Sequence, residues 1–168
     1  VDMLDADLCD LTPERVGNFD VVLFLGVFYH LYDPIEGLRQ AARLANELLI
    51  VETVLDLQDV DRPAMVFYPV AELNNDATNW WGPNPLCMID LLRGLGFTFI
   101  DATVHPLSRD RGIFHAWRSC KGHLQDAAFE TILSPALTGP YAGPVPATPA
   151  TPPAAARIDV ESLSRRQK

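Results

Sequence analysis

The stretch that decides the fold reads FDVVLFLG and spans residues 19–26 of a 168-residue chain. It is a nearly continuous apolar run that ends in glycine. This pattern is typical of a strand that is buried on both faces of a parallel sheet. The run is too short for an ordinary buried helix, which favours a strand. We therefore expect a parallel strand over residues 19–26.

A helix is predicted to follow this strand. Asp33 supplies an oxygen that can accept hydrogen bonds from free backbone N–H groups, and Pro34 suits the first helical position. Glu36 suits the positive end of the helix dipole. Apolar residues recur at helical spacing from Ile35, and polar residues such as Gln40 are expected on the opposite, water-facing side.

The rest of the chain continues the alternation of strands and helices. A second buried strand is predicted at 48–54, and the long irregular connection at 55–84 is a candidate lid. A capped helix at 84–96 leads to strands at 97–104 and 112–118, whose short connection implies an antiparallel pair. The sequence therefore predicts an α/β fold with a parallel, Rossmann-like sheet and an antiparallel last strand.

Charge and hydropathy restrict the function classes. The chain has 13 basic and 22 acidic residues, a formal net charge of −9, which disfavours nucleic acid as a partner without excluding tRNA. No apolar stretch reaches the roughly 18 residues of a membrane-spanning helix, and the N-terminus is acidic, unlike a signal peptide. We expect a cytoplasmic protein with a small-molecule substrate and no membrane partner.

Cysteines and histidines give no sign of a metal site. Cys9, Cys87 and Cys120 are too widely spaced for a CxxC motif, so buried reduced thiols are expected. The four histidines show no ligand spacing such as HxxxH, and we assign no metal.

The composition changes near residue 134. Seven of the 14 prolines lie in the last 35 residues, where a helix or a sheet ladder cannot be sustained. We therefore predict that residues 1–133 form the folded domain and that residues 134–168 form a disordered Pro/Ala-rich tail.

Several short motifs together resemble class I S-adenosylmethionine-dependent methyltransferases, in particular the tRNA wobble-uridine carboxymethyltransferase family and its uncharacterised methyltransferase relatives. The motifs are FDVV at 19–22, GVFYH at 26–30, DP at 33–34, VET at 51–53 and NWWGPNP at 79–85. The resemblance covers about residues 1–118. It implies a Rossmann-like methyltransferase sheet, S-adenosyl-L-methionine as cofactor and methyl transfer as the activity.

The resemblance also implies where the cofactor binds. Asp7 takes the place of the acidic residue that contacts adenine, with Asp5 as the competing register, and Leu8 offers its backbone N–H to the ring. The methionine part of the cofactor would be lined by Leu25, Gly26 and Tyr29.

One part of the family pattern is not found in this sequence. The glycine-rich turn after the family's first strand and the acidic residue that holds the ribose have no counterpart, because the ten glycines are scattered. We therefore expect an N-terminally truncated fold in which residues 1–133 are a partial methyltransferase domain. The strand at 19–26 would then have an unpaired apolar edge, and whether the fragment is active stays open.

Three residues are candidates for catalysis. His30 could act as the base for the acceptor, or it could be a structural histidine bonded within its loop. Tyr29 could donate to the cofactor or substrate, or pack under the next helix. Glu52 could face the cleft or pair with a cation such as Arg39 or Arg43, because an unpaired carboxylate at the end of an apolar strand is costly.

The long connection carries candidate substrate residues. Asn79, Trp80 and Trp81, with Asn74 and Asn75 before them, suit a lid over a small polar or ring-bearing acceptor. The tryptophans could equally anchor the loop to the core, and both interpretations can hold together.

The predicted function is methyl transfer to a small molecule or nucleoside, by in-line displacement at the carboxyl ends of the strands. Whether the donor is ordinary or carboxylated S-adenosylmethionine stays open. The alternative is a catalytically silent, methyltransferase-like binding module. A nicotinamide-dependent enzyme is less well supported, since its fingerprint turn is not found and the last strand is antiparallel.

Overall fold

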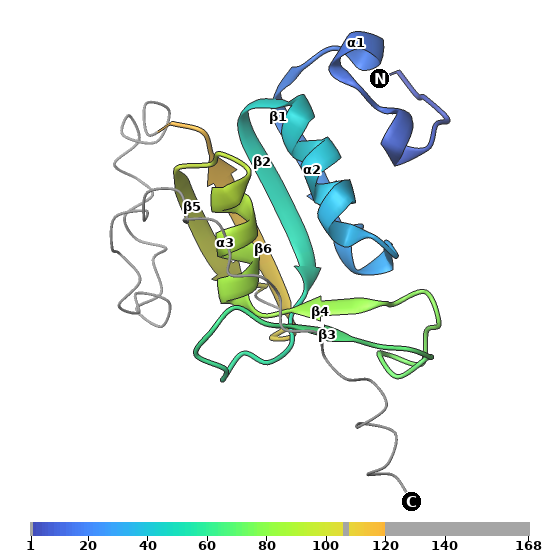
Figure 1. The fold of residues 1–168 in the computed structure, drawn as a ribbon, viewed down its shortest axis with the longest axis vertical. Coiled ribbons are helices and arrows are strands. Elements are labelled where there is room, and N and C mark those ends of the chain that lie inside the picture. Colours follow the sequence, from blue (N-terminus) through green and yellow to red (C-terminus); the bar gives the residue numbers. More distant parts are fainter. Residues whose placement is uncertain (1, 106–107, 120–168) are drawn as a thin grey trace, which may run out of the picture. The chain divides into compact units, whose positions relative to one another are not determined.

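Four strands form the main sheet of the computed structural model, which describes residues 2–105 and 108–119 (Figure 1). They are β1 (Phe19–Leu25), β2 (Ala45–Val54), β5 (Phe99–Val104) and β6 (Arg111–Trp117), in the order β1-β2-β6-β5. β1 and β2 are parallel, whereas β6 runs antiparallel to both β2 and β5. The predicted α/β fold with an antiparallel last strand is confirmed. The predicted tail at 134–168 lies outside the described residues.

Two helices cover one face of this sheet, α2 (Pro34–Leu44) and α3 (Pro85–Gly94) (Figure 1). The predicted start of α2 is confirmed, because the Asp33 side chain accepts from the Glu36 N–H at 3.1 Å. Asn84 caps α3 in the same way, with its Oδ1 2.9 Å from the Cys87 nitrogen. The short segments are η1 (Leu8–Asp10), α1 (Pro13–Val16) and η2 (Phe28–His30).

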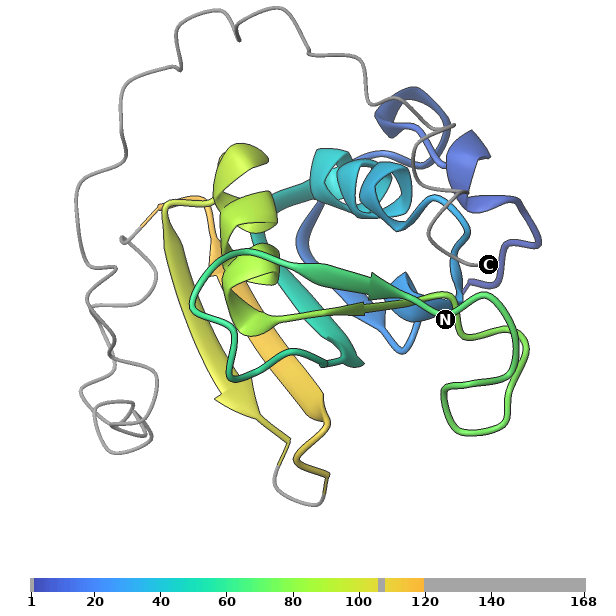
Figure 2. The same cartoon turned by 60° about the horizontal axis from the view of Figure 1, so that its bottom comes forward.

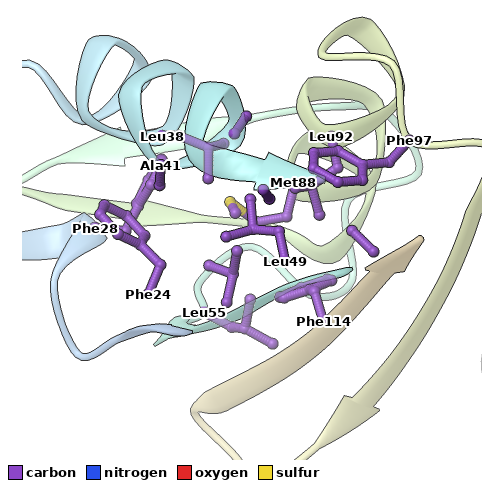
Figure 3. Packing of buried hydrophobic residues seen from close by; sticks show 14 residues of the cluster. Phe24, Phe28, Leu38, Ala41, Leu49, Leu55, Met88, Leu92, Phe97 and Phe114 are labelled. Carbon is purple, nitrogen blue, oxygen red and sulfur yellow. The ribbon is translucent and has the colours of Figure 1, made fainter. Parts of the chain in front are cut away.

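The hydrophobic core lies between the helices and the sheet (Figure 3). Phe24 of β1, Leu49 of β2 and Phe114 of β6 meet Leu38 of α2 and Leu92 of α3 there, and all are at most 4% exposed. Each such side chain contributes roughly 1.5–3 kcal/mol on burial. The core therefore fixes the positions of both helices on the sheet.

The other face of β1 is not covered by any described helix. Phe24 points to the core, whereas Phe19, Val21, Leu23 and Leu25 are 47–62% exposed. Alternate residues of a strand point to opposite faces, so helices on one face bury only half of its side chains. The prediction that this strand is buried on both faces is therefore wrong for the described residues. β1 also ends the strand order, with its second edge unpaired there.

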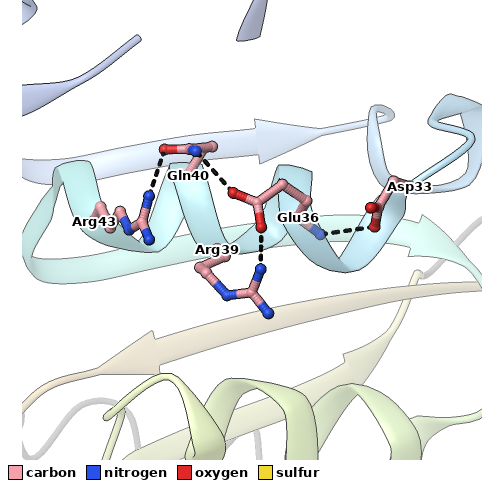
Figure 4. Close-up of polar contacts among 5 residues, drawn as sticks. All are labelled: Asp33, Glu36, Arg39, Gln40 and Arg43. Carbon is pink, nitrogen blue, oxygen red and sulfur yellow. Dashed lines mark hydrogen bonds and ion pairs between the residues drawn. The ribbon is translucent and has the colours of Figure 1, made fainter. Parts of the chain in front are cut away.

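The polar side of α2 is held together by its own side chains (Figure 4). Glu36 forms an ion pair with Arg39 and accepts from Gln40 Nε2 at 2.8 Å. Gln40 Oε1 lies 3.3 Å from Arg43 Nη1. The prediction that Gln40 faces water is wrong, since it is 8% exposed. The N–H and the carbonyl group of its side-chain amide therefore both have hydrogen-bond partners on α2.

The long connection at 55–84 is more regular than predicted. It contains the antiparallel pair β3 (Met65–Phe67) and β4 (Trp81–Pro83). The pair lies beside the end of β2 and beside η2 (Figure 2). At the far end of the connection, Asn74 and Asn75 adopt left-handed conformations with φ of 57° and 55°. Asparagine tolerates this conformation better than most residues, which suits it to the turn.

Asn84 ties the connection to α3. Its Oδ1 accepts from the Ala64 N–H at 3.1 Å as well as from Cys87. Its Nδ2 donates to the carbonyls of Val60 and Arg62, at 3.1 and 2.7 Å. Four hydrogen bonds from one side chain that is 1% exposed make it the main fixed point of the first half of the connection.

The expected buried thiols are only partly observed. Cys9 is exposed, which contradicts the expectation, and Cys87 is half-buried. Cys120 lies outside the described residues. Within residues 2–105 and 108–119, no helix is long and apolar enough to cross a membrane, and no three His, Cys, Asp or Glu side chains are grouped to hold a metal.

Candidate functional site

The candidate site is built around a glycine at the carboxyl end of β1. Gly26 has a φ of 68°, a conformation that favours glycine, and its N–H donates to the Glu52 carbonyl at 3.1 Å. A Cβ at this position would lie 3.7 Å from Tyr29 Oη and 3.8 Å from Glu52 Oε2. Three residues predicted for the site, Gly26, Tyr29 and Glu52, are therefore brought together.

Arg111 joins the side chains of Tyr29 and Glu52 in this group. Its Nη1 donates to Glu52 Oε1 at 2.7 Å and its Nη2 donates to Tyr29 Oη at 3.1 Å. The guanidinium carbon also lies 5.2 Å from the centroid of the Tyr29 ring. We call Gly26, Tyr29, Glu52 and Arg111 the strand-end cluster. The Glu52 side chain is 14% exposed and that of Arg111 is 30% exposed, so the ion pair remains partly accessible to solvent.

The cation that Glu52 meets differs from the predicted ones. Arg39 and Arg43 are occupied on α2, and Arg111 takes that place. The carboxylate of Glu52, followed by the Tyr29 hydroxyl, raises the pKa of Arg111 above its ordinary value. Arg111 is therefore a permanent positive charge that balances Glu52 at the strand ends.

Sequence reasoning missed Arg111, although a signal was present. An antiparallel last strand begins at the sheet edge where its parallel neighbour ends. Glu52 pairs with Ile113 and Val54 pairs with Arg111, so Glu52 and Arg111 are diagonal neighbours on one face of the sheet. Extending the predicted strand by one residue, from 112 to 111, would have placed the guanidinium beside the carboxylate.

His30 is held by the long connection. Its Nδ1 lies 3.0 Å from the Thr78 carbonyl oxygen and 3.1 Å from Thr78 Oγ1. Thr78 Oγ1 in turn donates to Asp76 Oδ1 at 2.7 Å. The ring centroids of His30 and Tyr29 are 4.2 Å apart, which puts His30 directly beside the strand-end cluster. His30 is exposed, so its other ring nitrogen can meet a ligand.

Trp80 and Trp81 join the connection to the segment after β1. The Trp80 N–H donates to the Tyr29 carbonyl at 2.8 Å, and Trp81 Nε1 donates to the Tyr32 carbonyl at 3.1 Å. The Trp80 ring meets Tyr32 edge to face at 5.4 Å, and the Trp81 ring lies 4.8 Å from Phe67. We call Tyr32, Phe67, Trp80 and Trp81 the aromatic cluster. Both tryptophans anchor the connection, and Tyr32 leaves an exposed ring, with 72% of its surface accessible.

Asn79 organises the connection from within. It is 3% exposed, and its Nδ2 donates to the Leu73 carbonyl at 3.0 Å. Its Oδ1 is buried without a hydrogen-bond partner among the described residues. The contacts of Asn79 are thus with its own loop, and its predicted contact with an acceptor stays a prediction.

Asp7 and Leu8 lie in the segment before β1. Asp7 caps η1 by accepting from the Cys9 N–H at 2.9 Å, and the Leu8 side chain packs against Gly37 in the first turn of α2. Among the described residues, no hydrogen bond joins either residue to Glu52 or Tyr29. Their assignment to adenine stays a prediction, as does that of Leu25, which is 49% exposed.

Comparison with known proteins gives one sequence relative and several weak structural likenesses. No protein-family model matches the chain. The tRNA U34 carboxymethyltransferase of Cellvibrio japonicus (strain Ueda107) is 30% identical over 100 residues, which is 58% of this chain and 30% of that protein. The chain therefore covers less than a third of that relative's length.

Two solved structures illustrate the structural likenesses. The N-terminal domain of EvdMO1, crystallised in the presence of SAH and D-fucose, has a TM-score of 0.46 at 20% identity, covering 67% of this chain and 52% of that one. Magnesium protoporphyrin IX methyltransferase (ChlM) from Synechocystis PCC 6803, with bound SAH, has a TM-score of 0.45 at 20% identity, covering 68% and 49%. Likenesses this weak do not by themselves establish a common fold.

The sequence relative bears directly on the resemblance inferred from the motifs. It carries the activity that the motifs around the first strand indicate, a wobble-uridine carboxymethyltransferase. The chain is thus similar in sequence to this kind of S-adenosylmethionine-dependent methyltransferase, and the predicted resemblance is confirmed.

Proposed function

We propose that the chain takes part in S-adenosylmethionine-dependent methyl transfer to a small molecule or a nucleoside. The observation that carries this proposal is the strand-end cluster, a glycine, a phenol and a balanced ion pair at the carboxyl ends of two parallel strands. In open α/β sheets, ligands bind at this end of the strands. The 30% identity to a tRNA U34 carboxymethyltransferase supports the same reaction class.

The cluster fits the methionine end of S-adenosylmethionine. Gly26 has no side chain, and a Cβ there would contact Tyr29 Oη and Glu52 Oε2. The carboxylate of Glu52 suits the positive sulfonium and ammonium groups, whereas the guanidinium of Arg111 suits a carboxylate. Asp7, Leu8 and Leu25 remain the candidates for the adenine and methionine contacts. When bound, the cofactor supplies an electrophilic methyl group.

The acceptor would be held by the connection and by His30. The cofactor would supply its methyl group to an acceptor nucleophile held in line with it, and His30 would take the proton of a protic nucleophile. The aromatic cluster offers rings on which a planar acceptor can stack. The net charge of −9 favours a small molecule, and a nucleoside within tRNA is the larger acceptor that the relative's name suggests.

A second candidate function is carboxymethyl transfer, and Arg111 is the observation that favours it. A guanidinium next to a phenol is suited to bind a carboxylate on the transferred group. Because Glu52 already neutralises Arg111, the added anion must share the guanidinium with it. The printed activity of the relative supports this candidate.

Calorimetric titration tests both candidates. S-adenosylhomocysteine and a carboxylated S-adenosylmethionine are titrated into the chain, and in parallel into the product of its gene expressed from the native start codon. Methyl transfer predicts binding of S-adenosylhomocysteine. Carboxymethyl transfer predicts that Arg111→Gln weakens the carboxylated ligand at least about tenfold and leaves S-adenosylhomocysteine nearly unchanged. Failure of both proteins to bind either ligand would leave the catalytically silent binding module.

A further inference from the structure

We propose that the turn at 76–78 is a positioning element that holds His30 as its Nδ1–H tautomer, so that Nε2 is the proton-accepting atom of the site. Asp76 and Thr78 belong to no motif of the resemblance. The catalytic consequence rests on the function proposed above, whereas the tautomer itself depends only on the geometry of the turn.

The Thr78 carbonyl decides which nitrogen carries the proton. It lies 3.0 Å from His30 Nδ1, and a carbonyl oxygen can only accept. A hydrogen bond at this distance therefore requires a proton on Nδ1. In the neutral ring, Nε2 then carries the free lone pair, which is the atom a general base needs.

The Thr78 hydroxyl supports the same assignment. Its proton is directed to Asp76 Oδ1, 2.7 Å away, and a carboxylate is an acceptor only. The lone pairs of Oγ1 are thus left for His30 Nδ1, at 3.1 Å. Both oxygens of Thr78 that face the ring accept, and the Nδ1 proton lies between them.

Asp76 fixes the orientation of Thr78. Its Oδ1 accepts from the Thr78 N–H at 2.9 Å and from the Thr78 hydroxyl, closing a turn of the kind that Asp residues favour. These hydrogen bonds, first that of the side chain, lower the pKa of Asp76, with a smaller contribution from His30. Asp76 is therefore ionised at neutral pH, and it remains an acceptor.

Backbone hydrogen bonds attach the turn to the segment that carries His30. The Asn79 N–H donates to the Asp76 carbonyl at 3.2 Å, and the next residue, Trp80, donates to the Tyr29 carbonyl. The Tyr29 ring covers one side of His30. Order in the connection and the tautomer of His30 are thus coupled, so a loop that closes over an acceptor would also prepare its base.

The test is long-range proton–nitrogen NMR of the ¹⁵N-labelled full chain at about pH 8, where an ordinary histidine is neutral. His30 is assigned by its loss in His30→Gln. We expect its Hδ2 to correlate strongly with an unprotonated nitrogen, which identifies Nε2. A protonated Nε2 in the wild-type chain would overturn the proposal.

Substitutions separate positioning from general loop stability. Asp76→Ala removes both acceptor contacts, and we expect the ring to exchange between its two tautomers. Asp76→Asn keeps an oxygen that accepts the same N–H and O–H, so it should restore the wild-type spectrum. Thr78→Val keeps the decisive carbonyl and should do the same. An unchanged spectrum in Asp76→Ala would overturn the proposal.

Kinetics then link the tautomer to the reaction. In an active preparation, Asp76→Ala should lower kcat on the order of tenfold with KM little changed, and Asp76→Asn should recover it. A correct tautomer without this kinetic effect would contradict the role of His30 as base and leave the positioning intact. In this way the failure of the proposed function is distinguished from the failure of the inference.

Discussion

The two arginines that bracket β6 have opposite surroundings. Arg118, just after the strand, donates to the backbone carbonyls of Ala45, Leu95 and Ala42 at 2.9, 3.2 and 2.6 Å. Its guanidinium carbon also lies 4.5 Å from the centroid of the Phe97 ring. Arg111, the first residue of the strand, donates to the side chains of Glu52 and Tyr29 in the candidate site.

This difference separates an end of the sheet with a structural role from the end that carries the candidate site. Arg118 donates hydrogen bonds to carbonyls near the ends of α2 and α3, where the helix dipoles favour a cation. It thereby joins both helices to β2. Arg111 holds the Glu52 carboxylate, whose side chain is 14% exposed, and the hydroxyl of the buried Tyr29 at the ends of the parallel strands. Acceptors in the backbone thus indicate a role in the fold, whereas side-chain acceptors in the candidate site are what we expect of a role in binding.

Among the substitutions of polar residues, Arg118→Leu should have the largest effect on stability. Three carbonyls lose a charged donor, and we expect the free energy of unfolding to fall by about 3 kcal/mol. Urea unfolding followed by circular dichroism measures it. A loss below about 1 kcal/mol would contradict the structural role assigned to this end of the sheet.

Asn84→Ala tests whether the end of the sheet that carries the candidate site also contains residues that stabilise the fold. Loss of its four hydrogen bonds and of the α3 cap should cost about 2 kcal/mol. Hydrogen exchange should rise most at residues 60–64, whose backbone groups it binds. Asn84→Asp is the comparison variant, because it keeps both accepted hydrogen bonds, including the α3 cap, and replaces the two donated ones by a carboxylate oxygen that repels the Val60 and Arg62 carbonyls. Uniform loss of protection across the chain would contradict a local role.

Arg111→Gln should weaken ligand binding more than stability, whereas Arg118→Leu is expected to act on stability. We expect a stability loss of about 1 kcal/mol, since a partly exposed ion pair contributes little. Binding of a carboxylated ligand should weaken at least about tenfold. Arg93→Gln, which breaks an exposed pair with Asp90 on α3, is the matched control and should change neither quantity. Equal losses of stability in Arg111→Gln and Arg118→Leu would contradict the distinction between the two ends of the sheet.

Leu23→Thr should have the smallest effect. Leu23 is 62% exposed on the face of β1 that the described helices leave open, so we expect a change within about 0.5 kcal/mol. Urea unfolding of Leu23→Thr is compared with that of Phe24→Ala. Phe24 is buried, and we expect its substitution to lower the free energy of unfolding by about 3–5 kcal/mol. A large loss in Leu23→Thr would mean that other residues cover this face in solution.

The order of elements could be predicted from the sequence because local signals agree with the packing. The apolar run of β1, the Asp33-Pro34 start of α2 and the Asn84-Pro85 start of α3 each specify one element, and the structure has all three. The antiparallel last strand followed from the short connection before it. These features depend on neighbours in the sequence, which are visible without a structure.

The site could be predicted only in part, because its contacts are remote in sequence. Gly26, Tyr29 and Glu52 were identified as site residues, but the partner of Glu52 depends on the register of β6. The contact between His30 and Thr78 depends on how the long connection folds back. Nothing in the local pattern at 55–84 indicates that path, and the pairing of β3 with β4 was missed for the same reason.

The most direct test of the account is titration of S-adenosylhomocysteine into the wild-type protein and Gly26→Val. A Cβ at Gly26 would contact Tyr29 Oη and Glu52 Oε2, and the φ of 68° also disfavours a β-branched residue. Gly17→Ala is the matched control, since Gly17 also has a positive φ, 79°, and has no atom within 4 Å of its added Cβ. We predict binding by the wild-type protein and by Gly17→Ala, with a loss of at least about tenfold in Gly26→Val. Equal binding by all three would contradict a cofactor site at the strand-end cluster.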